Sequence, residues 1–135
     1  MDDKNNLFKE FQSVLKNPIM IEGIDQYLID WRGVFKGKVK FVVFPSTTEE
    51  VSKILKLANK NNIPIVPQGG NTGLCGGATP DNSGNSVLIN FTKLNNIRNI
   101  DLLGNTVTVE AGCILENILN VVQEKDRIFP INLAA

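Results

Sequence analysis

The sequence predicts an α+β fold built on a β-α-β unit, with a small parallel or mixed sheet packed by helices. Two short apolar segments, residues 40–44 and 63–66, flank a stretch with the signature of a helix start. A third apolar segment and a hairpin pattern follow, and apolar residues recur at helical spacing near both ends of the chain. With 135 residues, the chain can form one compact core or part of a larger domain.

Residues 1–38 are expected to form an N-terminal helix and a connecting arm. Apolar residues at helical spacing predict an amphipathic helix over about residues 5–16. They are Leu7, Phe8, Phe11, Val14 and Leu15. The arm has no clear period, and its aromatic residues Tyr27, Trp31 and Phe35 are expected to pack on the main body, with Trp31 as the anchor.

Residues 40–44 (KFVVF) are β-branched and aromatic and end at Pro45, so they predict a buried strand. A helix start follows directly. Ser46 with Glu49, and Thr47 with Glu50, both have the spacing of a capping box, and the two glutamates suit the positive end of the helix dipole.

The expected buried face of this helix consists of Val51, Ile54, Leu55 and Ala58. Asn61 and Asn62 suit a left-handed C-terminal cap. Residues 63–66 (IPIV) then predict a second strand, parallel to the first, because a helical crossover joins the two.

Three further elements are expected after the β-α-β unit. Residues 86–91 (SVLINF) predict a third strand. Residues 97–101 and 106–112 predict a hairpin that turns near Gly104 and Asn105. The apolar spacing from Ile114 to Val122 predicts a final helix.

The composition excludes several classes of function. Lys plus Arg equals Asp plus Glu at 14 each, so a nucleic-acid partner is not expected. No apolar run approaches the ~20 residues of a membrane helix, and the start of the chain is polar and acidic. The chain is therefore expected to be cytoplasmic and without a transmembrane segment; peripheral association with the inner membrane, as part of a complex, is the alternative.

The chain contains no histidine, which removes the commonest general base and the commonest metal ligand. Cys75 and Cys113 lack the spacing of a metal site or a CxxC motif and are interpreted as reduced thiols. We therefore predict no catalytic and no metal-binding residues within this chain.

Five glycines occupy nine positions from Gly69 to Gly77, directly after the second predicted strand. The carboxyl ends of strands in open α/β sheets are where ligands bind. No lysine follows these glycines, which excludes a Walker A loop, and the residues after them would break the helix of a Rossmann motif. A non-helical loop whose N–H groups bind an anion remains, as does a set of tight turns without a ligand. In the ligand-binding interpretation, Gly69, Gly70 and Gly73 can reach conformations closed to other residues and admit a pyrophosphate.

Three motifs together resemble one family. They are FPSTTEEV, PQGGNTGLCGG and VTVEAG, and the upstream segment DWRGVFKGK also matches. The chain from about Tyr27 onward resembles the FAD-binding domain of vanillyl-alcohol-oxidase or p-cresol-methylhydroxylase (PCMH) type flavoproteins. Within these it is similar to the D-2-hydroxyacid dehydrogenases: D-lactate dehydrogenase, the glycolate oxidase D subunit and D-2-hydroxyglutarate dehydrogenase.

The resemblance implies that the glycine-rich segment binds the pyrophosphate of FAD. The implied contacts are Pro67, Gln68, Gly69, Gly70, Asn71, Thr72, Gly73 and Leu74, with Gly77 and Ala78 close by. Asn71 stands where some relatives carry a histidine bonded to the flavin, so FAD is expected to be non-covalent. Pro130 stands where the family chain passes the flavin again.

Other polar and small residues are expected to pack inside the protein or to lie at its surface. Val109, Ala111 and Gly112 are expected in the core or at close packing, rather than at the cofactor. Asp30 and Arg32 are expected at the solvated surface.

The resemblance also implies an incomplete domain. Residues 39–135 would be the N-terminal part of the FAD-binding domain, that is, its first α/β subdomain and the start of the second. The second glycine-rich stretch and the substrate domain of the relatives would be absent. The parent activity would be oxidation of a D-2-hydroxyacid to the 2-oxoacid, and this chain alone is expected to lack it. The remaining flavin and substrate domains could be a separate partner chain, and the 2-hydroxyacid would bind only to the complete enzyme. A non-catalytic FAD-binding or interaction module is the alternative, and an ATP- or NAD-binding domain ranks last.

Overall fold

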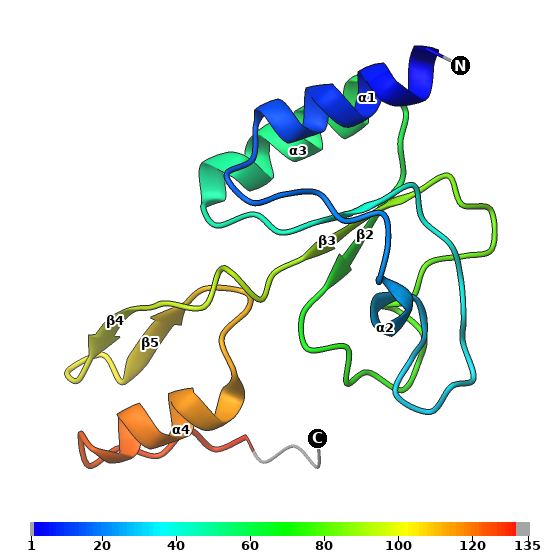
Figure 1. Cartoon of the computed structure of the whole chain (residues 1–135). Helices are drawn as coiled ribbons and strands as arrows, with labels where there is room; N and C mark the ends of the chain where they lie inside the picture. The colour runs from blue at the N-terminus through cyan, green and yellow to red at the C-terminus, as the bar shows by residue number, and fades with distance from the viewer. Residues whose placement is uncertain (1, 132–135) are drawn as a thin grey trace.

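The computed structural model describes residues 2–131 and contains both helices and strands (Figure 1). The elements in chain order are α1 (Asp2–Ser13), α2 (Asp25–Leu28), β1 (Val42–Val43), α3 (Thr48–Lys60), β2 (Ile65–Gln68), β3 (Val87–Asn90), β4 (Ile97–Asp101), β5 (Thr106–Val109) and α4 (Leu115–Gln123). All the elements expected from the sequence are present, and α2 is an addition within the arm.

Three strands form one parallel sheet in the order β1-β3-β2, in which β1 and β3 are buried throughout. β1 and β2 are joined through α3, so the β-α-β unit is confirmed, with β3 inserted between its two strands. Met20 adds an antiparallel bridge to Val42, which makes the sheet mixed at that edge. β2 is an edge strand of this sheet, and the glycine segment begins at its carboxyl end.

α3 begins with one of the two possible capping boxes. Thr47 is the N-cap, and its hydroxyl accepts a hydrogen bond from the N–H of Glu50. The Glu50 carboxylate in turn accepts from the N–H groups of Ser46 and Lys16, so it links the start of α3 to the end of the α1 segment. Asn62 has the expected left-handed conformation after the helix, with φ of 52°.

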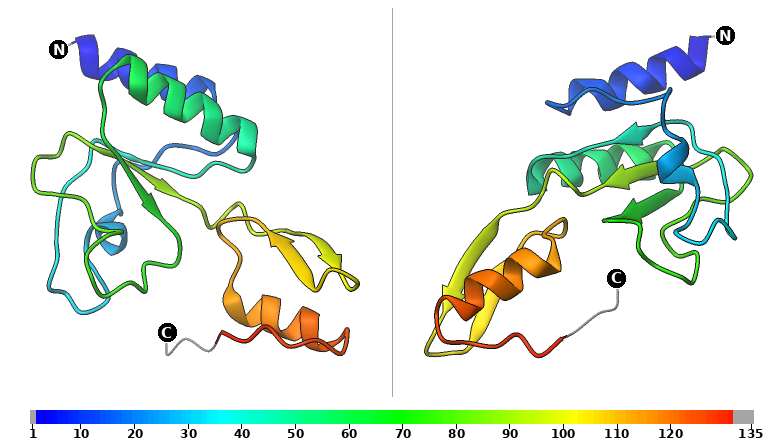
Figure 2. Two further views of the ribbon diagram at one scale, coloured as in Figure 1. Left: turned by 180° about the vertical axis from the view of Figure 1, so that it is seen from behind. Right: turned by 60° about the horizontal axis from the view of Figure 1, so that its bottom comes forward.

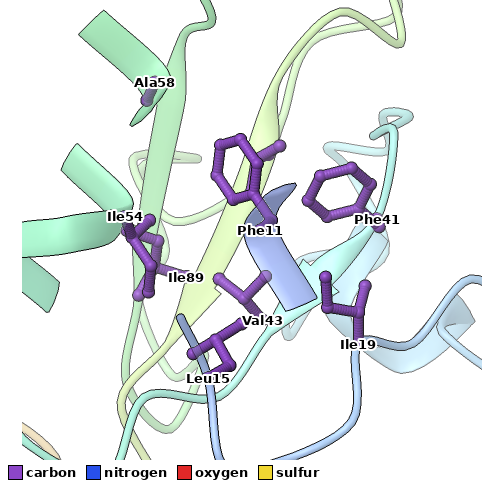
Figure 3. Packing of buried hydrophobic residues seen from close by; sticks show 9 residues of the cluster. Phe11, Leu15, Ile19, Phe41, Val43, Ile54, Ala58 and Ile89 are labelled. Carbon is purple, nitrogen blue, oxygen red and sulfur yellow. The ribbon is translucent and has the colours of Figure 1, made fainter. Parts of the chain in front are cut away.

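The sheet is buried on both faces, which explains its continuous apolar strands. On one face Val43 and Ile89 pack with α1 and α3 (Figure 3). The buried residues of this cluster are Phe11, Leu15, Ile19, Phe41, Val43, Ile54, Ala58, Val87 and Ile89. On the other face Val42 and Leu88 pack with Phe44 and with residues of the arm, including Tyr27.

The antiparallel hairpin of β4 and β5 and the helix α4 form a second lobe that extends from the end of β3 (Figure 2). The turn lies at Gly104 and Asn105 as expected, and Asn105 has φ of 49°. Arg98 of the hairpin bridges the lobes, because its guanidinium donates to Thr48 at the start of α3 and pairs with Glu110 at 3.0 Å.

Several expectations about the helices and the arm were wrong. α1 ends at Ser13, because the Gln12 side chain binds the backbone of Asn17 and Ile19 and turns the chain toward the sheet. Leu55 is 46% exposed, since α3 buries the side that carries Ile54 and Ala58. Trp31 is 75% exposed and is no packing anchor.

None of the helices in the described part of the chain combines the length and the apolar character needed to cross a bilayer. Residues 2–131 also contain no cluster of three or more His, Cys, Asp or Glu side chains that could hold a metal ion.

Candidate functional site

The glycine loop, residues 69–78, leaves the sheet at the carboxyl end of β2. Within residues 2–131, none of its ten backbone N–H groups donates to a protein acceptor. The next N–H along the chain, that of Thr79, donates to the carbonyl of Gly76. All ten residues are exposed or half-buried, so these N–H groups are accessible from outside the protein. The loop therefore offers a row of donors to solvent or to a ligand.

The glycines leave the surface of the loop bare. A Cβ atom at Gly69, Gly73 or Gly77 would meet no atom within 4 Å. The φ angles of Gly69, Gly70 and Gly73 lie outside the left-handed region, so this structure does not use the conformations that glycine alone can reach at these positions. The left-handed positions are Asn71, with φ of 56°, and Gly76, with φ of 74°. Gly69, Gly70 and Gly73 therefore contribute the absence of a side chain rather than a left-handed backbone conformation.

The Gln68 side chain lies inside the protein, with 1% of the residue exposed. Its Nε2 donates to the carbonyls of Tyr27 and Ala78, each at 2.9 Å, and its Oε1 accepts from Asn90. The side chain expected to contact a cofactor is thus engaged by the protein on all sides.

The arm also holds the loop. Asn71 Nδ2 donates to the carbonyls of Ile29, at 2.7 Å, and Gln26, at 3.2 Å. Arg32 is exposed, as expected, and it also donates to the carbonyl of Leu74 at 2.6 Å.

Asp30 shapes the arm at this point and is buried, with 4% exposed, contrary to the expected surface role. It accepts hydrogen bonds from the N–H groups of Phe35 and Arg32. Burial raises the pKa of Asp30, but these hydrogen bonds together lower it by a larger amount. The pKa of Asp30 is therefore below its usual value of 3.8.

A cleft of about 420 Å³ lies between the loop and the second lobe. One wall contains Gly69, Gly70 and Thr72, and the opposite wall runs from Ala111 to Glu116 at the start of α4; Thr92 also lines the cleft. Ala111 is exposed and lines this cleft, so its expected place in the core was wrong. Gly112 lines the cleft and is also a close-packing position. A Cβ there would lie 1.8 Å from the carbonyl oxygen of Phe91.

The sequence analysis missed the cleft residues Cys113, Ile114, Leu115 and Glu116. No sequence signal distinguished them from an ordinary helix start. Only the fold brings them opposite the loop, some forty residues earlier in the chain.

Three of the eleven predicted site residues, Gly69, Gly70 and Thr72, line the cleft, and the other eight do not. Pro67 and Gln68 end β2, and the loop contains Gly69, Gly70, Asn71, Thr72, Gly73, Leu74, Gly77 and Ala78. Pro130 is an exposed residue of the C-terminal segment and is not among the residues that line the cleft.

A smaller cavity of about 150 Å³ lies in the second lobe, between the hairpin and the segment after α4. Ile100, Val107 and Val122 line it together with Arg127, whose guanidinium donates to Asn105 and to the carbonyl of Leu102. Because these bonds already occupy the polar groups at its edge, the cleft beside the glycine loop is the stronger candidate.

Residues 39–135 match the model of a family described as FAD binding domain. The chain belongs to this family of FAD-binding domains. The match begins just before β1 and includes the glycine loop and both walls of the cleft.

Solved structures confirm the PCMH-type fold. The domain resembles alkyldihydroxyacetonephosphate synthase, with a TM-score of 0.77, 20% identity, and coverage of 90% of this chain and 25% of that one. It also resembles p-cresol methylhydroxylase with bound substrate, with a TM-score of 0.76, 25% identity, and coverage of 93% and 26%.

Curated relatives show similar coverage. One relative is a mitochondrial protein of Schizosaccharomyces pombe that is named as a candidate D-lactate dehydrogenase. It is 36% identical over 93% of this chain and 25% of its own length. The mitochondrial D-2-hydroxyglutarate dehydrogenase of Arabidopsis thaliana is 40% identical over 78% of this chain and 19% of its own. The chain thus spans about a quarter or less of these relatives. Their mitochondrial names do not support the cytoplasmic location expected from the sequence, which stays a prediction.

Proposed function

We propose that this FAD-binding domain holds the diphosphate of FAD, without a covalent bond, on the N–H groups of the glycine loop. This proposal rests on the row of ten N–H donors, from Gly69 to Ala78, that have no acceptor within residues 2–131. A diphosphate is a suitable acceptor, because successive backbone N–H groups form anion-binding concavities. The open space beside Gly69, Gly73 and Gly77 lets such an anion approach the main chain.

The chemistry at position 71 supports the non-covalent mode. The Asn71 amide donates to two carbonyls of the arm, and an amide nitrogen is a poor nucleophile. Flavin released intact by denaturation would support this mode.

The wall from Ala111 to Glu116 gives the cofactor a second surface. A cleft of about 420 Å³ is in the range of ligand pockets, and it is large enough to enclose part of a dinucleotide. Glu116 is an acid in this cleft, which suits a ribose hydroxyl better than a phosphate.

In the whole protein, we propose that this domain belongs to an oxidoreductase that converts a D-2-hydroxyacid to its 2-oxoacid. D-Lactate and D-2-hydroxyglutarate are the candidate substrates that the relatives' names support. Glycolate is a third candidate, which only the resemblance of the motifs implies. Bound FAD supplies the two-electron acceptor, whereas the protein supplies binding and orientation. The chain has no histidine, so a histidine base for the hydroxyl proton would have to come from outside these 135 residues.

Titration of the chain with FAD, followed by flavin fluorescence, tests the binding proposal. ADP should compete at lower concentrations than AMP, because recognition depends on the diphosphate. Protein that does not alter flavin fluorescence, or that binds AMP as well as ADP, would contradict the proposal.

Adding D-lactate or D-2-hydroxyglutarate to the FAD-loaded chain then tests the activity. We expect no bleaching of the flavin absorbance by the chain alone, and bleaching by the parent protein. If the parent also fails to bleach, a non-catalytic FAD-binding module is the better interpretation.

A further inference from the structure

The glycine loop is held in place through its carbonyl oxygens. The carbonyl of Gly69 accepts from Asn90 Nδ2 at 3.3 Å, that of Leu74 from Arg32 at 2.6 Å, and that of Ala78 from Gln68 Nε2 at 2.9 Å. The N–H groups of the loop, by contrast, have no acceptor among residues 2–131. Side-chain donors therefore fix the acceptor groups of the loop while its own donors stay free.

Gln68 and Asn90 act together at the two ends of the loop. Gly69 is its first residue and Ala78 its last, and each gives a carbonyl to one of the two side-chain amides. The amides also bind each other, from Asn90 Nδ2 to Gln68 Oε1 at 3.3 Å. The result is a continuous bridge of hydrogen bonds across the base of the loop.

The surroundings of both amides fix their orientation. Asn90 Oδ1 accepts from the N–H and the hydroxyl of Thr92, so its nitrogen must point toward Gly69 and Gln68. Gln68 Nε2 divides its two N–H groups between Ala78 and the carbonyl of Tyr27 in the arm. Gln68 and Asn90 are both fully buried, so water does not compete for these bonds.

We propose that Gln68 and Asn90 are positioning residues for the cofactor: their amide bridge clamps the ends of the glycine loop and preorganises its N–H groups for an anion. The inference rests on the proposed binding of FAD for its functional meaning. Its structural part, that the bridge orders the loop, holds with or without a ligand. A loop ordered before binding loses less conformational entropy when the ligand arrives.

Two near-isosteric neutral variants test the bridge. Gln68→Met and Asn90→Leu remove the amides while they keep the side-chain size similar and add no charge near the diphosphate. Asn17→Leu is the matched control, because its Nδ2 also donates to a carbonyl, that of Phe44, and to the Ser46 hydroxyl, away from the loop.

The first measurement is the backbone heteronuclear NOE of residues 69–78 in the full chain without FAD. We expect lower values in both bridge variants and unchanged values in Asn17→Leu. The second is the FAD dissociation constant, measured well below each variant's unfolding temperature. We expect it to rise about tenfold or more in the bridge variants and less than about twofold in the control, since preorganisation contributes directly to affinity.

The two proposals can fail separately. If the unmodified chain binds no FAD, the proposed function fails, while the NOE values still decide whether the bridge orders the loop. If either folded bridge variant keeps the loop NOE values and the FAD affinity of the unmodified chain, the positioning role is wrong. A loss of affinity in Asn17→Leu equal to that in the bridge variants would also overturn it, because general destabilisation would then explain the effect.

Discussion

At the scale of single residues, the glycines of the cleft have two different physical roles. At Gly69, a Cβ would project into open space, where a ligand could approach the main chain. At Gly112, a Cβ would collide with the carbonyl of Phe91, so this glycine allows two backbone segments to pack closely. The sequence shows only that both positions are glycine; the structure separates a binding surface from a packing contact.

Gly69→Val should therefore reduce FAD affinity about tenfold or more and change the unfolding temperature by only a few degrees, as a surface substitution does. Gly112→Ala should instead lower the free energy of unfolding by about 1–3 kcal/mol, because overpacking forces the backbone to move. Flavin titration and thermal unfolding of both variants check this contrast. A stable Gly69→Val variant with normal FAD affinity would contradict the proposed diphosphate position.

At the scale of elements, Glu110 holds together the two sides of the hairpin and supports Arg98, which joins the hairpin to α3. It accepts from the backbone and side-chain nitrogens of Asn96 and pairs with Arg98, which in turn reaches Thr48 at the start of α3. The N–H of Asn96, followed by the Arg98 guanidinium, lowers the pKa of Glu110 below its usual 4.5. A carboxyl with a lowered pKa in the folded state stabilises that state above its unfolded pKa.

The contribution of Glu110 should be complete at neutral pH and be lost as the pH falls below about 4.5 through the lowered pKa of the folded state. Glu110→Gln should thus reduce stability at pH 7 and show a smaller further loss on acidification. Urea unfolding across this pH range is the measurement. Glu124→Gln, which changes an exposed carboxylate at the end of α4, is the control. Parallel pH profiles for Glu110→Gln and the unmodified chain would refute this role.

At the scale of the whole molecule, the cleft lies between two lobes that are linked by few contacts. The three-stranded sheet with α1 and α3 carries the glycine loop, and the lobe of β4, β5 and α4 carries the opposite wall (Figure 1). A ligand that contacts both walls would couple the lobes, because it binds only when both are in place.

Hydrogen exchange measured with and without FAD tests this coupling. We expect slower exchange on FAD addition in peptides that cover residues 69–78 and 111–116, and little change in α1. The effect should be large in the glycine loop, whose N–H groups have no acceptor within residues 2–131 and exchange readily when no ligand is present. Protection limited to one wall would show that the cofactor does not bridge the lobes.

The sequence by itself determined the type and order of most elements, because their signals are local. The capping spacing of Thr47 and Glu50, the apolar strand residues Val42 and Val43, and the turn at Asn105 each depend on near neighbours in the chain. The glycine segment was recognisable as a candidate anion site for the same reason, since bare backbone after a strand is visible in the residues alone.

Only the tertiary structure decided which groups are free to bind. Gln68, at the end of β2, and Asn71, in the glycine loop, are polar residues that could face a cofactor. The fold turns both amides toward backbone carbonyls of the arm and the loop. It also brings the wall from Ala111 to Glu116 opposite Gly69. These outcomes depend on contacts between residues far apart in the chain, and hydrogen-bond partners across such distances leave no periodic signal in the sequence.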